Sequence, residues 1–243
     1  MMSRRKWIAG VPAAGSLLLS ACKDSLPPAY GTLFDLSNSL TFSAHRALLR
    51  NQPLVREFAR DRITKNFPAI NETNPKNDRY QQLLAGGFAE WRLPIAGLVS
   101  QPAELSLEAL KQLPSRTQVT QHNCEQGWSA IAEWTGVTLK HILEDAGMLP
   151  QARYVVFHTV DGWWDSLDMF DALHPQTLLA YGMNGGALPV AHGAPVRLRV
   201  ERQLGYKSLK YLSRIDVTDR LDDVEDGTGA VGAAYGYSWY AGI

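Results

Sequence analysis

Short apolar segments, each ended by Gly, Pro or polar residues, succeed one another along residues 88–220. Residues 154–160 are almost wholly apolar, and residues 195–202 alternate aliphatic with charged side chains, which is the period of a half-buried strand. Short helices are expected after Ser106 and Thr138, whose hydroxyls can cap them. We therefore predict an α+β fold in which mixed β-sheets are accompanied by a few short helices.

Charged and aromatic residues indicate which of these segments meet solvent. Arg199 and Arg202, in residues 195–202, are expected on a solvated face of their strand, because charged side chains are rarely buried without a partner. A glycine turn then returns the chain as a strand over residues 208–217. Residues 161–165 contain two adjacent Trp and are expected to form a loop at the mouth of a site.

The length and composition fit a single globular unit. The chain has 243 residues, of which 45% are hydrophobic and 20% charged, which suffices for one good-sized core. Its 24 basic and 24 acidic residues give a formal net charge of +0, so no basic excess indicates a nucleic-acid partner. No apolar run reaches the roughly 20 residues that a membrane-spanning helix needs.

The N-terminus has the pattern of an export signal. Arg4, Arg5 and Lys6 precede the apolar residues 8–19, as in a secretory signal peptide. The arginine pair favours twin-arginine export, which carries folded proteins, and a general secretion signal with incidental arginines is the alternative. We predict that the mature protein is periplasmic.

Residues 19–22, Leu-Ser-Ala-Cys, resemble a bacterial lipobox that ends at Cys22. Two interpretations stay open: residues 1–21 are a signal peptide followed by a lipid anchor at Cys22, or the small residues form a simple cleavage site. In the first case the protein is a membrane-anchored lipoprotein. Residues 22–79 are expected to form a tether and an N-terminal segment of helix and loop, with helical spacing over residues 37–65 that a proline interrupts.

The second cysteine is the most informative single residue. Cys22 and Cys124 are the two cysteines of the chain, and Cys124 has no partner if Cys22 is lipidated or marks the cleavage site. An unpaired thiol is unusual in an oxidising compartment. An inert buried thiol and a nucleophile activated by His122 are two interpretations. The residues around Cys124 point to a third.

Cys124 lies in the first of four motif blocks. Residues 122–129 read His-Asn-Cys-Glu-Gln-Gly-Trp-Ser, and Phe-His-Thr follows at residues 157–159. Residues 181–198 contain Tyr-Gly-Met-Asn-Gly-Gly and His-Gly-Ala-Pro-Val-Arg, and residues 204–210 read Leu-Gly-Tyr-Lys-Ser-Leu-Lys. In this order and spacing the blocks resemble the molybdopterin-binding domain of the sulfite oxidase family. They are most similar to its exported bacterial branch, which includes the catalytic subunit of periplasmic methionine sulfoxide reductase.

The resemblance implies a sulfite-oxidase-type molybdopterin-binding fold. Residues 80–220 are the expected catalytic domain, and residues 221–243 are expected to be a C-terminal tail. The implied cofactor is molybdenum–molybdopterin, and the implied metal ligand is Cys124. A protein thiolate is the type of ligand that molybdenum takes beside hard oxo groups.

The resemblance also implies which side chains surround the cofactor. Lys207 is expected to add to the positive charge that binds the pterin phosphate. The implied cofactor contacts are Asn66, Phe67, Thr159, His192, Arg197, Ser208, Leu209 and Lys210. Beside these contacts, Cys124, His122 and Glu125 are the candidate catalytic residues by their position. His122 either tunes the metal or meets substrate, or is a satisfied polar neighbour, and Glu125 either relays protons or is a surface or supporting partner. Trp128 is expected in the core.

The implied function is a molybdenum-dependent oxidoreductase that transfers an oxygen atom on a small sulfoxide, N-oxide or related substrate. Two cysteines cannot hold an iron–sulfur cluster by four thiolates, and the sequence has no Cys-x-x-Cys-His haem motif. A separate electron-transfer partner is therefore expected, with a membrane haem protein as the candidate. The alternatives are a non-catalytic envelope lipoprotein that keeps the fold and a thiol enzyme that uses Cys124.

Overall fold

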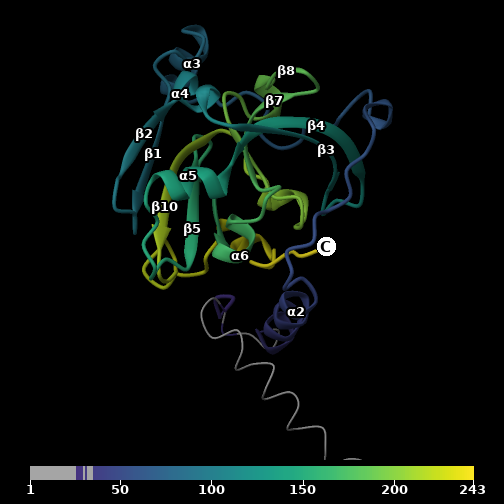
Figure 1. The fold of residues 1–243 in the computed structure, drawn as a ribbon, viewed down its shortest axis with the longest axis vertical. Helices are drawn as coiled ribbons and strands as arrows, with labels where there is room; N and C mark the ends of the chain where they lie inside the picture. Colours follow the sequence, from purple (N-terminus) through teal and green to yellow (C-terminus); the bar gives the residue numbers. More distant parts are fainter. Residues whose placement is uncertain (1–25, 30, 32–34) are drawn as a thin grey trace, which may run out of the picture.

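The computed structural model describes residues 26–29, 31 and 35–243. The predicted signal peptide and Cys22 lie outside these residues. Figure 1 shows two β-sheets in the body of the molecule, with short helices around them and one longer helix at the end where the described chain begins. This arrangement confirms the predicted α+β class with mixed sheets.

Five strands form the first sheet: β1 (Arg92–Gly97), β2 (Ala103–Ser106), β5 (Tyr154–Thr159), β6 (Trp164–Asp168) and β10 (Leu212–Thr218). They lie in the order β2-β1-β10-β5-β6, with β1 parallel to β10 and the other neighbours antiparallel. Strand β10 is therefore central, and its Ile215 and Val217 are buried. A central strand with buried aliphatic side chains anchors the sheet in the core.

The second sheet holds β3 (Ser115–Asn123), β4 (Ser129–Thr138), β7 (Leu178–Met183) and β8 (Gly186–Ala187), and β9 (Arg197–Arg199) pairs with β7. All of its pairs are antiparallel. Strands β3 and β4 pair along their length, from Ser115 opposite Val137 to Asn123 opposite Ser129. The turn between them therefore begins at Cys124.

The helices are α2 (Asp35–Leu48), α3 (Asp78–Ala85), α4 (Leu107–Gln112), α5 (Leu139–Asp145) and α6 (Met169–Ala172), with 3-10 turns η2 (Arg60–Arg62), η3 (Val190–His192), η4 (Gly205–Lys207) and η5 (Val231–Tyr235). Ser106 Oγ accepts from Ala109 N at 3.0 Å and Thr138 Oγ1 accepts from His141 N at 3.3 Å. These bonds confirm the predicted caps of α4 and α5. None of the helices in the described ranges is long and apolar enough to cross a membrane.

Three apolar cores hold the described elements together, and the smallest is formed largely by side chains of β4 and β7, including Trp134. The largest core takes buried side chains from both sheets and from α5, including Leu93, Phe157 and Leu179. A second core joins α2 to the C-terminal segment, where Phe42 packs edge-on against Tyr240 with ring centres 5.1 Å apart. Residues beyond β10 therefore belong to the packed structure, and they continue to the wall of the site described below.

The segment predicted as a half-buried strand, residues 195–202, is buried on both faces. The expected solvated face is wrong, because Arg199 is 1% exposed and Arg202 is 3% exposed. Arg199 forms an ion pair with Glu201 at 2.8 Å, and Arg202 forms one with Asp171 at 2.5 Å. Each buried cation is matched by a buried carboxylate, an arrangement that an alternating sequence pattern does not reveal.

Two predicted elements are shorter than expected. The strand predicted over residues 208–217 begins only with β10, because Tyr211 has φ = 56°, a left-handed conformation that does not continue a strand. Of residues 37–65, only the first part is in α2. The chain that follows lies against β3 instead, where Phe58 N donates to Val119 O at 2.9 Å.

Candidate active site

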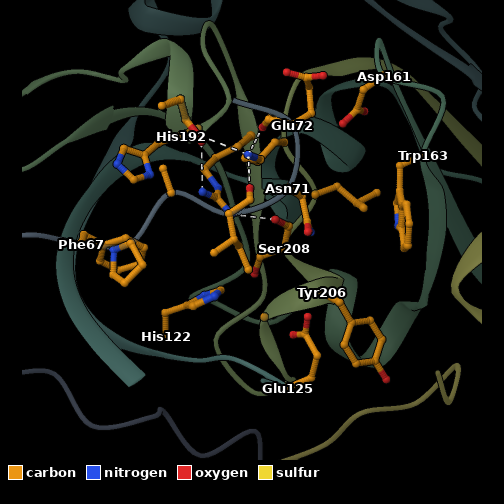
Figure 2. Close-up of a pocket in the computed structure, with 18 of the residues that line it drawn as sticks. Phe67, Asn71, Glu72, His122, Glu125, Asp161, Trp163, His192, Tyr206 and Ser208 are labelled. Atoms are coloured by element: carbon orange, nitrogen blue, oxygen red, sulfur yellow. Dashed lines mark hydrogen bonds between the residues drawn. The ribbon is translucent and has the colours of Figure 1, made fainter. Parts of the chain in front are cut away.

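A cavity of about 470 Å³ lies beside the turn that follows β3. Its walls come from the second sheet and the turns beside it, from the loop between β5 and β6, from the loop before α3 and from the C-terminal segment. Figure 2 shows Phe67, His122 and His192 along one side, opposite Trp163 and Tyr206. The lining residues belong to segments 67–72, 122–128, 161–163, 191–197, 205–210 and 235–237.

Cys124 is held in the tight turn between β3 and β4. Its N donates to Trp128 O at 2.9 Å, and Gly127 N donates to Cys124 O at 3.1 Å. The side chain is 5% exposed, forms no disulfide within the described residues, and lies 3.5 Å from Glu125 Oε2. Burial raises the pKa of this thiol, and Glu125 adds to the effect. Cys124 itself is not among the lining residues, whereas His122, two residues before it, and Glu125, directly after it, line the cavity.

His122 is a buried, neutral imidazole at the end of β3. Its Nδ1 lies 2.9 Å from Nη1 of Arg199, and because a guanidinium only donates, Nδ1 is the acceptor and Nε2 carries the proton. Burial, then the charges of Arg199 and Arg197, hold the pKa of His122 far below its usual value. A Cβ at Gly205 would collide with this ring, so the cavity depends on a glycine at that position.

Arg197 brings a buried positive charge to the cavity lining, next to His192. Its Nη atoms donate to His192 O at 3.0 Å and to Ser208 O at 2.7 Å, and its guanidinium lies 5.0 Å from the Trp134 ring centre. Burial, then Arg199, lowers its pKa to about 9. Nε has no hydrogen-bond partner within the described chain, so one donor of a buried cation remains unsatisfied at the cavity.

Lys210 joins the loop before α3 to the rest of the cavity. Its Nζ donates to Ile70 O at 2.8 Å, to Glu72 O and to Ala191 O at 3.2 Å. Burial, then Arg197, lowers the pKa of Lys210 to about 8. The amine is therefore a point charge within reach of the cavity that also fixes the loop around Glu72.

Of the remaining predicted contacts, four line the cavity and two do not. The four are Phe67, His192, Ser208 and Leu209. Phe67 packs between His122 and His192, with ring centres 5.7 and 5.6 Å apart, and both Ser208 and Leu209 also line the cavity. Burial, followed by Arg197 and Lys210, lowers the pKa of His192 to about 4, so this ring is also neutral near pH 7.

Asn66 and Thr159 are not among the lining residues. Asn66 is exposed. The Thr159 hydroxyl is 2.5 Å from Asp161 Oδ1 and 2.7 Å from Trp163 O, so it holds the loop after β5 in place. Thr159 thus acts on the cavity by positioning Asp161 and Trp163, which do line it.

The predicted phosphate role of Lys207 is wrong. Its side chain is buried, forms an ion pair with Asp165 and donates to Ser166 O at 2.9 Å and Trp239 O at 2.7 Å. Lys207 is also not among the residues that line the cavity, whereas Lys210 is. The loop predicted over residues 161–165 is correspondingly shorter, because its last two residues lie in β6 and are buried.

Some lining residues were missed by the sequence interpretation. Trp128, expected in the core, lines the cavity, and so do Glu72, Tyr235 and Tyr237. The last three lie outside the motif blocks, and Tyr235 comes from η5, near the end of the chain. Local sequence gave no signal for them because their proximity to the site arises from tertiary packing.

A family model for the oxidoreductase molybdopterin-binding domain matches residues 82–224. That stretch includes the four motif blocks and every strand described above. The chain belongs to this family. Both the free thiol of Cys124 and the buried guanidinium of Arg197 lie within the residues that match the molybdopterin-binding domain.

Relatives of this molybdopterin-binding domain protein include reductase subunits. The chain is 40% identical over 180 residues to the putative protein-methionine-sulfoxide reductase subunit YedZ1 of Azospira oryzae, covering 74% of this chain and 64% of that protein. It is 32% identical over 145 residues to the protein-methionine-sulfoxide reductase catalytic subunit MsrP of Campylobacter jejuni, covering 53% of this chain and 49% of that protein. The chain thus spans about half to two thirds of the length of these relatives.

A solved structure of a related protein supports the family's fold for this chain. The sulfane dehydrogenase SoxCD from Paracoccus pantotrophus matches with a TM-score of 0.52 and 26% sequence identity. The match covers 59% of this chain and 40% of that chain. The matched part of this chain is therefore similar in fold to a solved molybdopterin enzyme structure.

Proposed function

We propose that this chain is the catalytic subunit of a molybdenum-cofactor oxidoreductase that reduces a sulfoxide, N-oxide or related oxide by oxygen-atom transfer. The observation that supports it most directly is the free, buried thiol of Cys124, held in a turn whose neighbours His122 and Glu125 line the cavity. The printed names of the relatives, protein-methionine-sulfoxide reductase subunits, favour a sulfoxide.

The side chains present fit a molybdenum–pterin group. Cys124 supplies a soft sulfur donor at one part of the site. Arg197 supplies a buried guanidinium whose Nε is unsatisfied within the described residues, and Lys210 supplies a second cation. A phosphate is the type of group that such donors bind. When bound, the cofactor supplies a metal centre that exchanges an oxygen atom and two electrons with the substrate.

The protein's own groups have separable roles in this proposal. Cys124 holds the metal, and Arg197, Lys210, His192 and the backbone around Ser208 bind the pterin and its phosphate. The Nε2–H of His122 can donate one hydrogen bond, since its Nδ1 already accepts from Arg199. Reduction of an oxide consumes protons, and the Glu125 side chain lines the cavity, where it can take up a proton from solvent and relay it to the substrate oxygen.

A thiol enzyme is less well supported. A nucleophilic Cys124 would need a base with a free lone pair, and the Nδ1 lone pair of His122 is occupied by Arg199. The buried guanidinium of Arg197, whose Nε has no partner within the described residues, also has no role in thiol chemistry.

Electrons must reach the site from another protein in this proposal. We propose a membrane haem protein as the donor, and the word "subunit" in the names of the relatives is consistent with a two-component system. We further propose that the protein is exported to the periplasm by the twin-arginine route and anchored by lipid at Cys22, both on the sequence of its first 22 residues.

Replacing Arg197 by Gln is expected to lower pterin retention by at least about tenfold, because a charged hydrogen bond contributes ~1.5–3 kcal/mol. Lys210→Gln is expected to lower it less, since an ammonium is a point charge rather than a planar fork. The measurement is the pterin released per chain after gel filtration, with the melting temperature as a check on folding.

The matched control for the Arg197 variant is Arg214→Gln. Arg214 is exposed on β10 and pairs with Asp216 at 2.6 Å, away from the cavity lining. Arg199 cannot serve as the control, because it is buried against Glu201 and His122. Full pterin retention in Arg197→Gln, or equal loss in Arg214→Gln, contradicts the assignment of the phosphate site.

Replacing Arg4 and Arg5 together by Lys is expected to leave the precursor in the cytoplasm, because twin-arginine export depends on the guanidinium pair. Cell fractionation with an antibody against the mature chain measures the distribution. Normal periplasmic levels of the double-lysine variant exclude this export route.

Cys22→Ala provides the separate test of the anchor: it should move the protein from the membrane to the soluble periplasmic fraction.

A further inference from the structure

The cavity has two chemically different ends. The cofactor side carries the cations Arg197 and Lys210. The opposite end, which we call the aromatic end, consists of Asp161, Trp163, Tyr206, Tyr235 and Tyr237. Figure 2 shows Asp161, Trp163 and Tyr206 together on this side, away from Phe67 and the histidines.

The aromatic end is built from two stacked pairs. Trp163 stacks on Tyr235 with ring centres 5.7 Å apart and planes 15° apart, and Tyr206 stacks on Tyr237 at 4.8 Å and 20°. Tyr235 is the last residue of η5, and the backbone of Tyr237 is held by a bond from its N to Gly232 O at 3.0 Å. The rings therefore present a preformed aromatic surface to whatever occupies this part of the cavity.

The charges at the cavity favour a cation once the cofactor is in place. Asp161, Glu72 and Glu125 line the cavity. The two lining cations, Arg197 and Lys210, are the groups assigned to the pterin phosphate. Carboxylates beside aromatic ring faces form the type of site that recognises ammonium and guanidinium groups.

We propose that the aromatic end is a specificity site that selects an oxide-bearing substrate with a positively charged group next to the oxide, and that disfavours anionic substrates. The inference rests on the proposed reductase function. A peptide in which Lys or Arg lies next to a sulfoxide-bearing residue belongs to this class of substrate. Asp161 supplies the charge, and Tyr235, which is 68% exposed, supplies the ring face that a substrate meets.

The first experiment compares two short peptides in which a methionine sulfoxide lies between two lysines or between two glutamates. The holoenzyme, reduced by a viologen dye, should show a kcat/KM about tenfold higher for the lysine peptide, mostly through KM. Salt at 0.5 M should reduce that preference, since exposed charges are screened. Asp161→Asn should bring the ratio close to one.

The control variant is Asp145→Asn, which removes the same charge from an exposed residue of α5 that pairs with His141 at 3.4 Å. It should leave the ratio unchanged. A wild-type preference for the glutamate peptide overturns the proposal, as does an Asp161→Asn enzyme that keeps the tenfold ratio.

A second readout does not depend on turnover. Phenyltrimethylammonium should quench the fluorescence of Trp163 in the holoprotein, and Tyr235→Leu should weaken its binding several-fold. Trp163→Phe identifies the responding residue. If the ammonium probe binds in this way while neither peptide is reduced, the specificity site stands and the reductase function fails. If Trp163 does not respond to the probe, the specificity site is refuted whatever the activity.

Discussion

Replacing Cys124 by Ser is expected to reduce turnover by at least about a thousandfold, which is ~4 kcal/mol in activation free energy. A serine hydroxyl is a hard, protonated donor at neutral pH and does not replace a thiolate as a ligand for a soft metal site. The fold should persist, because Cys124 makes its turn through backbone bonds to Trp128 and Gly127 that serine keeps.

The Cys124→Ser variant separates the metal ligand from the pterin site. Pterin should still be retained in this variant, since the phosphate donors Arg197 and Lys210 are unchanged. X-ray absorption at the molybdenum edge should show one sulfur neighbour fewer than in the wild type. Wild-type turnover in the serine variant excludes Cys124 as the metal ligand.

Replacing Lys207 by Met is expected to lower the free energy of unfolding by ~3–5 kcal/mol, because it leaves the carboxylate of Asp165 buried without its cation. Both side chains are almost fully buried, at 1% and 2% exposure. A loss of this size lowers the melting temperature by roughly 10 °C in a chain of this length. Urea unfolding of the purified apoprotein measures the loss directly.

The pH dependence of that loss has a definite sign. Burial raises the pKa of Asp165, and Lys207 is the charge that opposes the rise. Removing Lys207 raises the pKa of Asp165 in the folded state further above its value in the unfolded chain. Proton uptake by Asp165 at low pH therefore stabilises the folded variant relative to the unfolded one. The deficit relative to wild type should therefore be smaller at pH 5 than at pH 8.

Two controls test the origin of the destabilisation. Lys140→Met removes an exposed lysine that pairs with Glu144 at 3.6 Å, and it should cost under ~0.5 kcal/mol. Adding Asp165→Asn to Lys207→Met should recover part of the loss, because no buried charge is then left unpaired. A Lys207→Met protein as stable as wild type refutes the importance of the pair.

Local sequence was sufficient for much of the fold. The caps at Ser106 and Thr138 were predictable because each depends on one hydroxyl and a backbone N–H three residues later. The strand over residues 154–160 was predictable because an apolar run of that length rarely does anything else between turn residues. Neither prediction required knowledge of a distant partner.

Burial of charge was not predictable from the same patterns. Residues 195–202 alternate like a half-buried strand, yet Arg199 and Arg202 are inside the protein. Their compensation by Glu201 and Asp171 depends on how distant segments pack. Lys207 was misjudged for the same reason: its sequence neighbours suggested a phosphate, whereas β6 brings Asp165 to it.

The candidate site also contains residues that the sequence predicts and residues that only tertiary packing brings there. Most residues implied by the motif blocks, such as His122, Arg197 and Lys210, line one cavity, because each block places them at a strand end or turn. Tyr235 and Tyr237 could not be foreseen, since they follow the last strand and reach the cavity only through the packing of the C-terminal segment.

The molybdenum and pterin content of the protein purified from its native host tests the central claim most directly. Elemental mass spectrometry is expected to find about one molybdenum atom per chain, and fluorescence after oxidation an equal amount of pterin. A folded, exported protein that contains neither molybdenum nor pterin would contradict the claim.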